Sequence, residues 1–262
     1  MDIQGLIKRV RSGVLSIEFE LDGQVVASGS GFMARGLLVT NNHVYAGPAG
    51  SKVIISWQLD KAPDSREHIK MSITSFKSKL KRGSPESDHD YAILDIDELK
   101  GKGLNQFELE LHDDRDIGDE VVLMGYPFGS KNLVAHAGYI SSFTRSKEAQ
   151  VIQIDASVNS SNSGGPLISV ATGKVIGIVT RKGTGITEKF QELIRVFDVN
   201  IKTIAPQLGA MSIGGVDVVQ SISASQEQMK IICRQIERSA NVGIGYAFGF
   251  HELLPDLDGL TT

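Results

Sequence analysis

The sequence is poor in several features that mark large classes of protein. It has a single cysteine, Cys233, so no disulfide can form within the chain, and an intracellular, cytoplasmic location is expected. Its net charge of -4 offers no basic surface for nucleic acid. No stretch approaches the roughly 20 apolar residues of a membrane span, and the N-terminus lacks the apolar core of a signal peptide. We therefore expect neither a nucleic-acid nor a membrane partner.

What the sequence does contain is a large apolar fraction in short runs. Apolar residues make up 41% of the chain, enough for one large or two small globular domains with a buried core. Asp22-Gly23, between two of the runs, is typical of a β-hairpin turn. Strands are predicted at 14–19, 25–32, 37–40, 53–57, 69–76, 91–96, 121–124, 133–140, 151–154, 167–170 and 175–180. Many short strands joined by Gly, Pro and Asp turns indicate a barrel or a sandwich.

Three stretches have helical rather than strand spacing. Apolar residues within 3–10 recur at intervals that predict a short amphipathic helix. Two further helices are predicted at 189–199 and 225–239, and the second carries Met229 and Ile236 on one face. The second half of the chain is therefore expected to combine strands with helical additions.

One serine lies on a glycine-rich turn between two apolar runs. Ser163 is followed by Gly164, Gly165 and Pro166, and such a turn lets the backbone approach a substrate carbonyl closely. A serine hydroxyl is a weak nucleophile that needs a base, a carboxylate behind the base and donors for the oxyanion. His43 and Asp90 are the matching base and acid upstream. Chemistry of this kind uses no metal and no cofactor.

The order His43, Asp90, Ser163 resembles the chymotrypsin-like (trypsin-like) serine proteases, and the HtrA-like peptidases most closely. The motifs that carry the resemblance are Gly29-Ser30-Gly31-Phe32, Thr40-Asn41-Asn42-His43-Val44, Asp90-Tyr91-Ala92-Ile93-Leu94, Gly118-Asp119-Glu120-Val121-Val122, Gly125-Tyr126-Pro127-Phe128-Gly129, Ala137-Gly138-Tyr139-Ile140-Ser141, the serine turn, and Val175-Ile176-Gly177-Ile178-Val179-Thr180. They cover roughly residues 14 to 182, with a return near 243–248. All of them in order are stronger evidence than any one alone.

The resemblance implies an all-β fold with helical additions: two Greek-key β-barrels of the chymotrypsin type, with the active site in the cleft between them. The expected divisions are an N-terminal helix or arm at 1–13, a first barrel at 14–100, a second barrel at 101–182, a partly helical insertion at 183–241, and a final strand with a tail at 242–262. Insertions of that length are usually functional or independently folded. The PDZ domain of the family is expected to be absent.

The resemblance also assigns roles to the reactive residues. Ser163 is the nucleophile, His43 the base and then the acid, and Asp90 the group that orients the histidine, with Asp88 as the other candidate acid. The backbone N–H groups of Ser161 and Ser163 would form the oxyanion hole. Position 161 is usually glycine in the family, so serine there is a departure that points to control by loop movement. Asn162 stands where zymogen-type trypsins have an aspartate, which makes activation by N-terminal cleavage unexpected.

The same resemblance places a substrate pocket beside the serine turn. Ser157 would form its floor, and its walls would come from Val158, Asn159, Ser160, Thr180, Arg181 and Lys182. The hydroxyl of Thr180 would also support the catalytic aspartate. A neutral floor gives no partner to a substrate Lys or Arg, so small or medium apolar side chains are expected before the scissile bond.

The sequence thus predicts an intracellular serine endopeptidase that acts on proteins or peptides through an acyl-enzyme. A regulatory protein partner is expected to act through the 183–241 insertion, and a purely structural insertion is the alternative. Two other functions stay open: a protease-fold interaction module with an idle triad, and an esterase or acyltransferase that uses the same residues.

Overall fold

The computed structural model describes residues 2–59, 62–111, 113–146, 149–159, 161–180, 185–239 and 243–260. The chain forms two compact units. The first, called the body here, comprises Met1–Arg181 and Gly243–Thr262, and the second, the insertion, comprises Lys182–Val242. Within the described ranges, no helix is long and apolar enough to cross a membrane.

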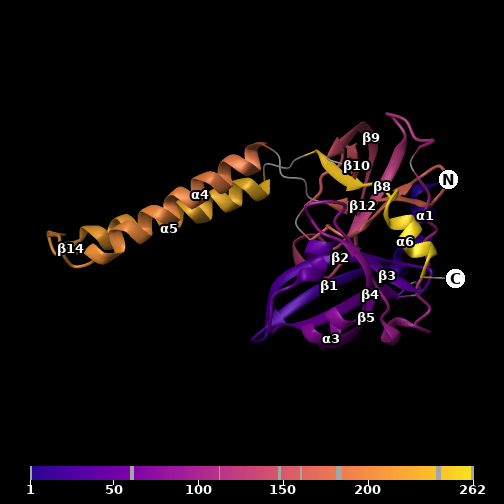
Figure 1. The fold of residues 1–262 in the computed structure, drawn as a ribbon, viewed down its shortest axis with the longest axis horizontal. Coiled ribbons are helices and arrows are strands. Elements are labelled where there is room, and N and C mark those ends of the chain that lie inside the picture. The colour runs from indigo at the N-terminus through magenta and orange to yellow at the C-terminus, as the bar shows by residue number, and fades with distance from the viewer. Residues whose placement is uncertain are drawn as a thin grey trace. The chain divides into compact units, whose positions relative to one another are not determined.

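The first half of the body is a seven-stranded antiparallel sheet (Figure 1). Its strands are β1 (Val14–Leu21), β2 (Gln24–Ala34), β3 (Leu37–Thr40), β4 (Lys52–Leu59), β5 (Ala62–Ser72), β6 (Leu80–Ser84) and β7 (Tyr91–Leu94). The short helices α2 (Asn42–Ala46) and α3 (Ile73–Ser78) lie between them in the chain, and the 3-10 turn η2 (Asp97–Leu99) follows β7. The strand order is β5-β4-β1-β2-β3-β7-β6. Asp22 and Gly23 join β1 to β2 with φ angles of 50° and 79°, the left-handed pair that a tight hairpin turn requires. Large side chains, Trp57 and Phe76 among them, fill the core of this sheet.

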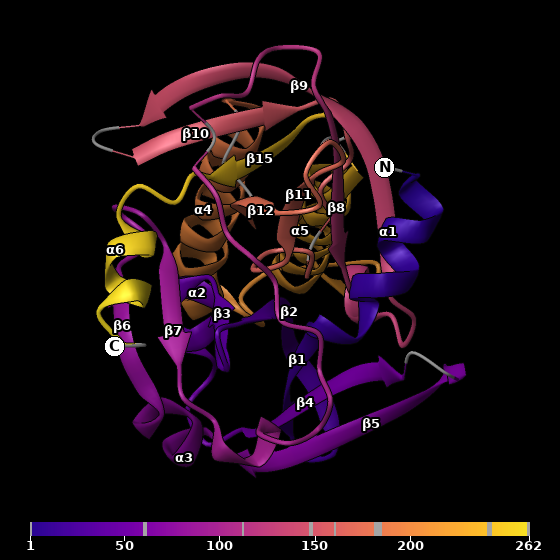
Figure 2. The same ribbon diagram turned by 90° about the vertical axis from the view of Figure 1, so that its right-hand side faces the viewer.

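The second half of the body is a closed six-stranded barrel (Figure 2). Its strands are β8 (Glu120–Gly125), β9 (Val134–Ser146), β10 (Ala149–Ile154), β11 (Pro166–Ser169), β12 (Val175–Thr180) and β15 (Gly245–Phe248), with η3 (Pro127–Gly129) after β8. β15 pairs with both β10 and β12. The strand that returns after the insertion therefore completes the barrel. The all-β, two-barrel fold class predicted from the sequence is confirmed, although hydrogen bonds close only the second of the two sheets.

A further apolar cluster joins the two halves of the body. It contains residues of β2, β3 and β7 from the first sheet and of β8, β11 and β12 from the second. Helix α1 (Ile3–Val10) adds Leu6 and Val10 to it, and α6 (Leu253–Asp258) adds Leu253 and Leu257. The Asp2 side chain caps α1 by accepting the N–H groups of Gln4 and Gly5, and the 3-10 turn η1 (Arg11–Gly13) leads into β1. Both ends of the chain thus help to hold the two sheets together.

The insertion is a helical hairpin. Helix α4 (Gly185–Ile204) is followed by η4 (Ala205–Gln207), the two-residue strands β13 (Ser212–Ile213) and β14 (Val216–Asp217), and helix α5 (Val218–Ser239). The two long helices pack side by side (Figure 1). Among their described side chains, the buried ones are Ile194, Val219, Cys233 and Lys230. The Lys230 ammonium group pairs with Asp198 at 2.6 Å and with Glu227 at 3.0 Å. Many large apolar side chains in the described part of the insertion are exposed: Leu193, Val196, Val199, Leu208, Met211, Ile213, Val216, Ile222, Met229, Ile231, Ile232 and Ile236.

One predicted strand is wrong in its second half. The run 69–76 was expected to be extended throughout, but the strand ends at Ser72 and α3 begins at Ile73. The Ser72 hydroxyl accepts the Ser75 N–H at 3.1 Å, which is an N-cap contact. The helix buries Ile73 and Phe76. Because an apolar run of this length suits a strand or a short buried helix equally, the cap was the only local signal.

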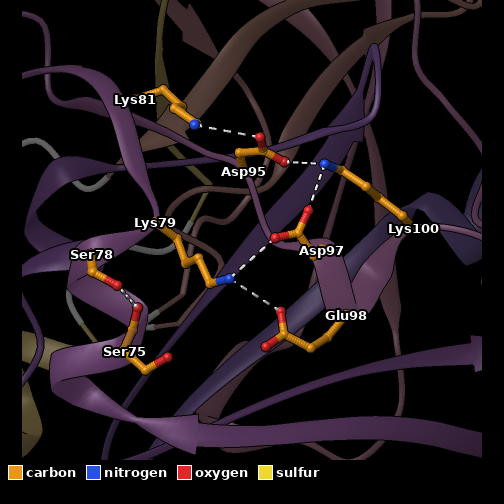
Figure 3. A network of polar contacts seen from close by, with 8 residues as sticks. All are labelled: Ser75, Ser78, Lys79, Lys81, Asp95, Asp97, Glu98 and Lys100. Carbon is orange, nitrogen blue, oxygen red and sulfur yellow. Dashed lines mark hydrogen bonds and ion pairs between the residues drawn. The ribbon is translucent and has the colours of Figure 1, made fainter.

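A surface ion-pair network links Lys79 and Lys81, at the start of β6, to acidic residues in and next to η2 (Figure 3). The Lys100 ammonium group lies 2.7 Å from both Asp95 and Asp97, and Lys79 lies 3.4 Å from Asp97. The hydrogen bond from Lys100 lowers the pKa of Asp95. Lys100, Asp97 and Glu98 are exposed and Lys79 and Asp95 are half-buried. Solvent therefore screens these pairs, and they add little to the free energy of unfolding.

Candidate active site

His43 and Asp90 meet at the edge where β3 and β7 pair. His43 lies in α2, directly after β3, and Asp90 immediately precedes β7. His43 Nδ1 lies 2.8 Å from Asp90 Oδ2, and the backbone N–H of His43 donates to Asp90 Oδ1 at 3.0 Å. A carboxylate at Nδ1 favours the tautomer with its proton on that nitrogen, which leaves Nε2 as the free acceptor. The ring is therefore set up to take a proton on the side away from Asp90.

Asp90 is held in place by its surroundings. It is 1% exposed and has a φ of 48°, an unfavourable backbone conformation for a residue other than glycine. The Thr180 hydroxyl donates to Oδ2 at 3.3 Å, and the Asn41 side-chain amide donates to the Asp90 carbonyl at 2.8 Å. Asp88, the other candidate acid, lies 3.7 Å from His89 instead. The predicted contact of His43 with Asp90 is confirmed.

Ser163 lies on the turn that precedes β11, and backbone hydrogen bonds tie this turn to β2 of the first sheet and to β12 of the barrel. The Ser30 N–H on β2 donates to the Ser163 carbonyl at 2.8 Å, and the Gly164 N–H donates to the Val179 carbonyl at 2.8 Å. A Cβ on Gly164 would lie 2.0 Å from the Ser30 carbonyl oxygen and 2.4 Å from Thr40 Oγ1, so only glycine fits. Thr40 ends the strand that leads to His43. The hydrogen bonds of the described residues do not include one from the Ser163 hydroxyl to His43.

Ser161 and Asn162 give the loop before Ser163 an unusual conformation. Ser161 has a φ of 76°, which costs a residue other than glycine about 1–2 kcal/mol. Its hydroxyl lies 2.7 Å from that of Ser28, and its carbonyl accepts the Ser30 hydroxyl at 2.7 Å. Asn162 is fully buried, and among the described residues neither its amide nitrogen nor its amide oxygen has a hydrogen-bond partner. Sequence reasoning identified the departure at 161 but missed Ser28 and Ser30, because their contacts join positions about 130 residues apart.

The predicted pocket residues do not all have the expected surroundings. The Ser157 hydroxyl accepts the Gly243 N–H at 3.0 Å, so the proposed floor is bound to the chain just before β15. The Asn159 carbonyl accepts a hydrogen bond from the Asn162 N–H at 3.1 Å. Val158 requires a correction: its side chain is 3% exposed and packs in the barrel core, where Gly245 leaves room for it. Ser160, Arg181 and Lys182 lie outside the described residues.

Ile244 is a pocket candidate that sequence reasoning missed. It follows Gly243, which contacts Ser157, and its side chain is exposed. Gly245 and Ala247 lie on the face of β15 that is turned into the barrel. Ile244 directly precedes β15, and extending the alternation of side chains by one residue places it on the other face. This alternation was readable from the sequence once the strand had been placed.

Within the described parts of the chain, no group of three or more His, Cys, Asp and Glu side chains could hold a metal ion. His136 lies on β9 opposite Leu123. Its Nε2 is buried without a partner in the described structure, and burial lowers its pKa. Its position is that of a structural histidine of the barrel.

Comparisons with known proteins agree with this geometry. Residues 23–178 match the family model described as trypsin-like peptidase domain. The chain is 31% identical over 198 residues to Protease Do-like 5, chloroplastic, of Arabidopsis thaliana, which covers 71% of this chain and 58% of that protein. It is 34% identical over 167 residues to the Putative serine protease HhoA of Synechocystis sp., which covers 60% of this chain and 37% of that protein. The chain therefore spans little more than half of the first of these relatives and less of the second.

Solved structures show the same likeness. The crystal structure of Deg5 matches with a TM-score of 0.54 and 25% identity, over 70% of this chain and 88% of that one. The HtrA-type protease AlgW with tripeptide matches with a TM-score of 0.59 and 22% identity, over 100% of this chain and 64% of that one. At such identity the second match supports the fold alone.

Proposed function

Because this chain belongs to the trypsin-like peptidase family, we propose that it is a serine endopeptidase that hydrolyses proteins or peptides through His43, Asp90 and Ser163. The observation that carries the proposal is the 2.8 Å contact between His43 Nδ1 and Asp90 Oδ2. The Asp90 carboxylate is buried, and it also accepts hydrogen bonds from the His43 backbone N–H and the Thr180 hydroxyl. The Ser163 turn is bonded to the strand next to the one that leads to His43.

The proposed reaction follows from these positions. The Ser163 hydroxyl oxygen attacks the scissile carbonyl carbon, and its proton passes to His43 Nε2. Asp90 stabilises the resulting imidazolium, and the N–H groups of Ser161 and Ser163 donate to the oxyanion. When the tetrahedral intermediate collapses, the C–N bond breaks and His43 gives the proton to the leaving amine. Water then attacks the acyl-enzyme by the same route and releases the carboxylic acid. Nucleophile, base and oxyanion donors all come from the protein, so no cofactor or metal enters the proposal.

The pocket favours apolar side chains before the scissile bond. Ser157 is uncharged and its hydroxyl already accepts the Gly243 N–H, while Ile244 offers an exposed apolar surface nearby. A substrate Lys or Arg would lose its hydration there without gaining a charged partner among these residues. We therefore propose that Ala, Val or Leu is preferred at this position.

The insertion is proposed to regulate the site through its two junctions with the body. Thr180, at the first junction, donates to Asp90, and Gly243, at the second, donates to Ser157. The loop between them carries a left-handed Ser161 and an Asn162 with an unpartnered buried amide. The backbone strain at Ser161 and the unpaired Asn162 amide raise the free energy of this loop conformation, which makes an alternative conformation easier to reach. A protein partner that binds the insertion more tightly in one of the two conformations would shift the equilibrium between them by the ratio of its two affinities.

A protease-fold interaction module with an idle triad is the second candidate. The observation in its favour is the exposed apolar surface of the insertion, which includes Met229, Ile232 and Ile236.

Cytoplasmic location stays a prediction that rests on the single cysteine.

Peptide cleavage by purified wild type and by Ser163→Ala separates the two functions. The endopeptidase proposal predicts turnover by the wild type and a loss of several orders of magnitude in the variant. Equal rates for the two proteins would refute the assignment of Ser163. A parallel ester substrate identifies an esterase, which would cleave the ester but not the peptide.

A further inference from the structure

Ser161 is held by two serines of one strand. Ser28 and Ser30 lie on β2 at positions i and i+2, so both side chains are on the same face of the strand. The Ser28 hydroxyl lies 2.7 Å from the Ser161 hydroxyl, and the Ser30 hydroxyl donates to the Ser161 carbonyl at 2.7 Å. Both contacts reach the residue whose φ is 76°.

The Ser30 hydroxyl has a second partner. The backbone N–H of Tyr126, which follows β8, donates to Ser30 Oγ at 3.0 Å. A carbonyl oxygen only accepts and a backbone N–H only donates, so Ser30 accepts from Tyr126 and directs its own proton to the Ser161 carbonyl. The Ser30 N–H also donates to the Ser163 carbonyl at 2.8 Å. One buried residue thus bonds to both residues that carry the proposed oxyanion donors.

We propose that Ser28 is a positioning residue that, with Ser30, keeps Ser161 in its left-handed conformation and so keeps its N–H in the oxyanion hole. The inference rests on the proposed function for the role of that N–H. A glycine adopts this conformation without strain, whereas a serine needs compensation. The Ser161 side chain that causes the strain also supplies the hydroxyl that Ser28 contacts. The two serines therefore form a pair whose effects depend on each other.

A double-mutant cycle tests this dependence. The variants are Ser28→Ala, Ser161→Gly and both together, with Ser28→Thr as a matched control that keeps a hydroxyl. In the Ser161 background, Ser28→Ala should lower kcat roughly tenfold with little change in KM, since a misplaced oxyanion donor weakens transition-state binding more than substrate binding. In the Ser161→Gly background the same change should leave kcat within about twofold, and Ser28→Thr should recover most of the loss.

Two results would overturn the inference. One is an equal loss from Ser28→Ala in both backgrounds, which would mean that Ser28 acts through something other than Ser161. The other is no loss in either background. Ser30→Ala is unsuitable as the main variant, because it would leave the Tyr126 N–H and the Ser161 carbonyl without their present partner.

A readout that does not need activity separates this inference from the proposed function. Amide hydrogen exchange over residues 159–165 should speed up in Ser28→Ala but not in the double variant. If Ser163→Ala keeps full activity, the proposed function fails, and exchange alone then decides the inference: unchanged exchange in Ser28→Ala refutes it. If Ser163→Ala is inactive and Ser28→Ala changes neither kcat nor exchange, the function stands and the role of Ser28 is refuted.

Discussion

Asp90 holds His43 by two hydrogen bonds, one to the ring nitrogen Nδ1 at 2.8 Å and one to the backbone N–H at 3.0 Å. The two oxygens of one carboxylate thereby fix both the position of the residue and the plane of its ring. The backbone of Asp90 is left-handed, with a φ of 48°. Because such a conformation persists only where the surroundings enforce it, the geometry is a built feature of the site rather than a chance contact between exposed side chains.

Asp90→Asn should lower kcat by about 10⁴-fold while the fold is kept, because the amide can present its NH₂ to the ring and favour the wrong tautomer. Asp88→Asn is the matched control: Asp88 lies two positions away and pairs with His89, so its kcat should stay within about twofold. Steady-state kinetics on a peptide substrate measures both. A large loss in Asp88→Asn with none in Asp90→Asn would reverse the assignment of the acid.

A carboxylate at the pocket floor should change the substrate preference. In the wild type, peptides with Ala, Val or Leu before the scissile bond should have a higher kcat/KM than those with Lys or Arg. Ser157→Asp should raise the ratio of Lys to Leu cleavage by at least roughly tenfold, since the new carboxylate pairs with the substrate cation. Ile244→Ala is the companion variant and should weaken Leu cleavage without favouring Lys. A wild-type preference for Lys or Arg would contradict the neutral floor.

His136 should make the protein less stable in mild acid. Burial lowers its pKa from the ordinary 6.5, so the unfolded chain binds a proton more readily than the folded one. Its contribution is full above about pH 6.5 and is lost as pH falls through the lowered value. Urea unfolding at pH 7.5 and pH 5 should therefore show a smaller drop for His136→Leu than for the wild type. The exposed His68 on β5 gives the control, His68→Leu. An unchanged drop in His136→Leu would contradict this account.

Replacement of residues 185–239 by a short Gly-Ser linker should leave the body folded, because its two sheets are complete without them. If the insertion regulates the site through Thr180 and Gly243, basal kcat should change by more than about threefold and any response to a partner should disappear. Circular dichroism checks the fold, and peptide cleavage with and without cell fractions measures the response. A folded variant with unchanged activity and unchanged response would show that the insertion is structural.

Much of the body could be predicted because its motifs are local. The strands at 37–40 and 175–180 have the bounds predicted from the sequence, and the Tyr91-Ala92-Ile93-Leu94 run that follows Asp90 favours it over Asp88. The helix at 73–78 was missed because the same apolar run fits either structure. Val158 was wrongly assigned to the pocket wall because its burial depends on Gly245, which follows the insertion in the sequence.

The features that no local pattern indicates are the tertiary ones. Ser161 has a left-handed backbone and forms hydrogen bonds with Ser28 and Ser30. In the sequence, nothing distinguishes these three serines from other polar residues. The unpartnered amide of Asn162 likewise depends on what surrounds it after folding.

The most direct test of the central claim is to locate a covalent adduct. After reaction with a fluorophosphonate probe, peptide mass spectrometry of the wild type should show the added mass on Ser163. Ser163→Ala should show no adduct, and His43→Ala should react at least roughly 100-fold more slowly because the hydroxyl has lost its base. An adduct on another residue, or equal labelling of wild type and His43→Ala, would contradict a nucleophile at Ser163 activated by His43.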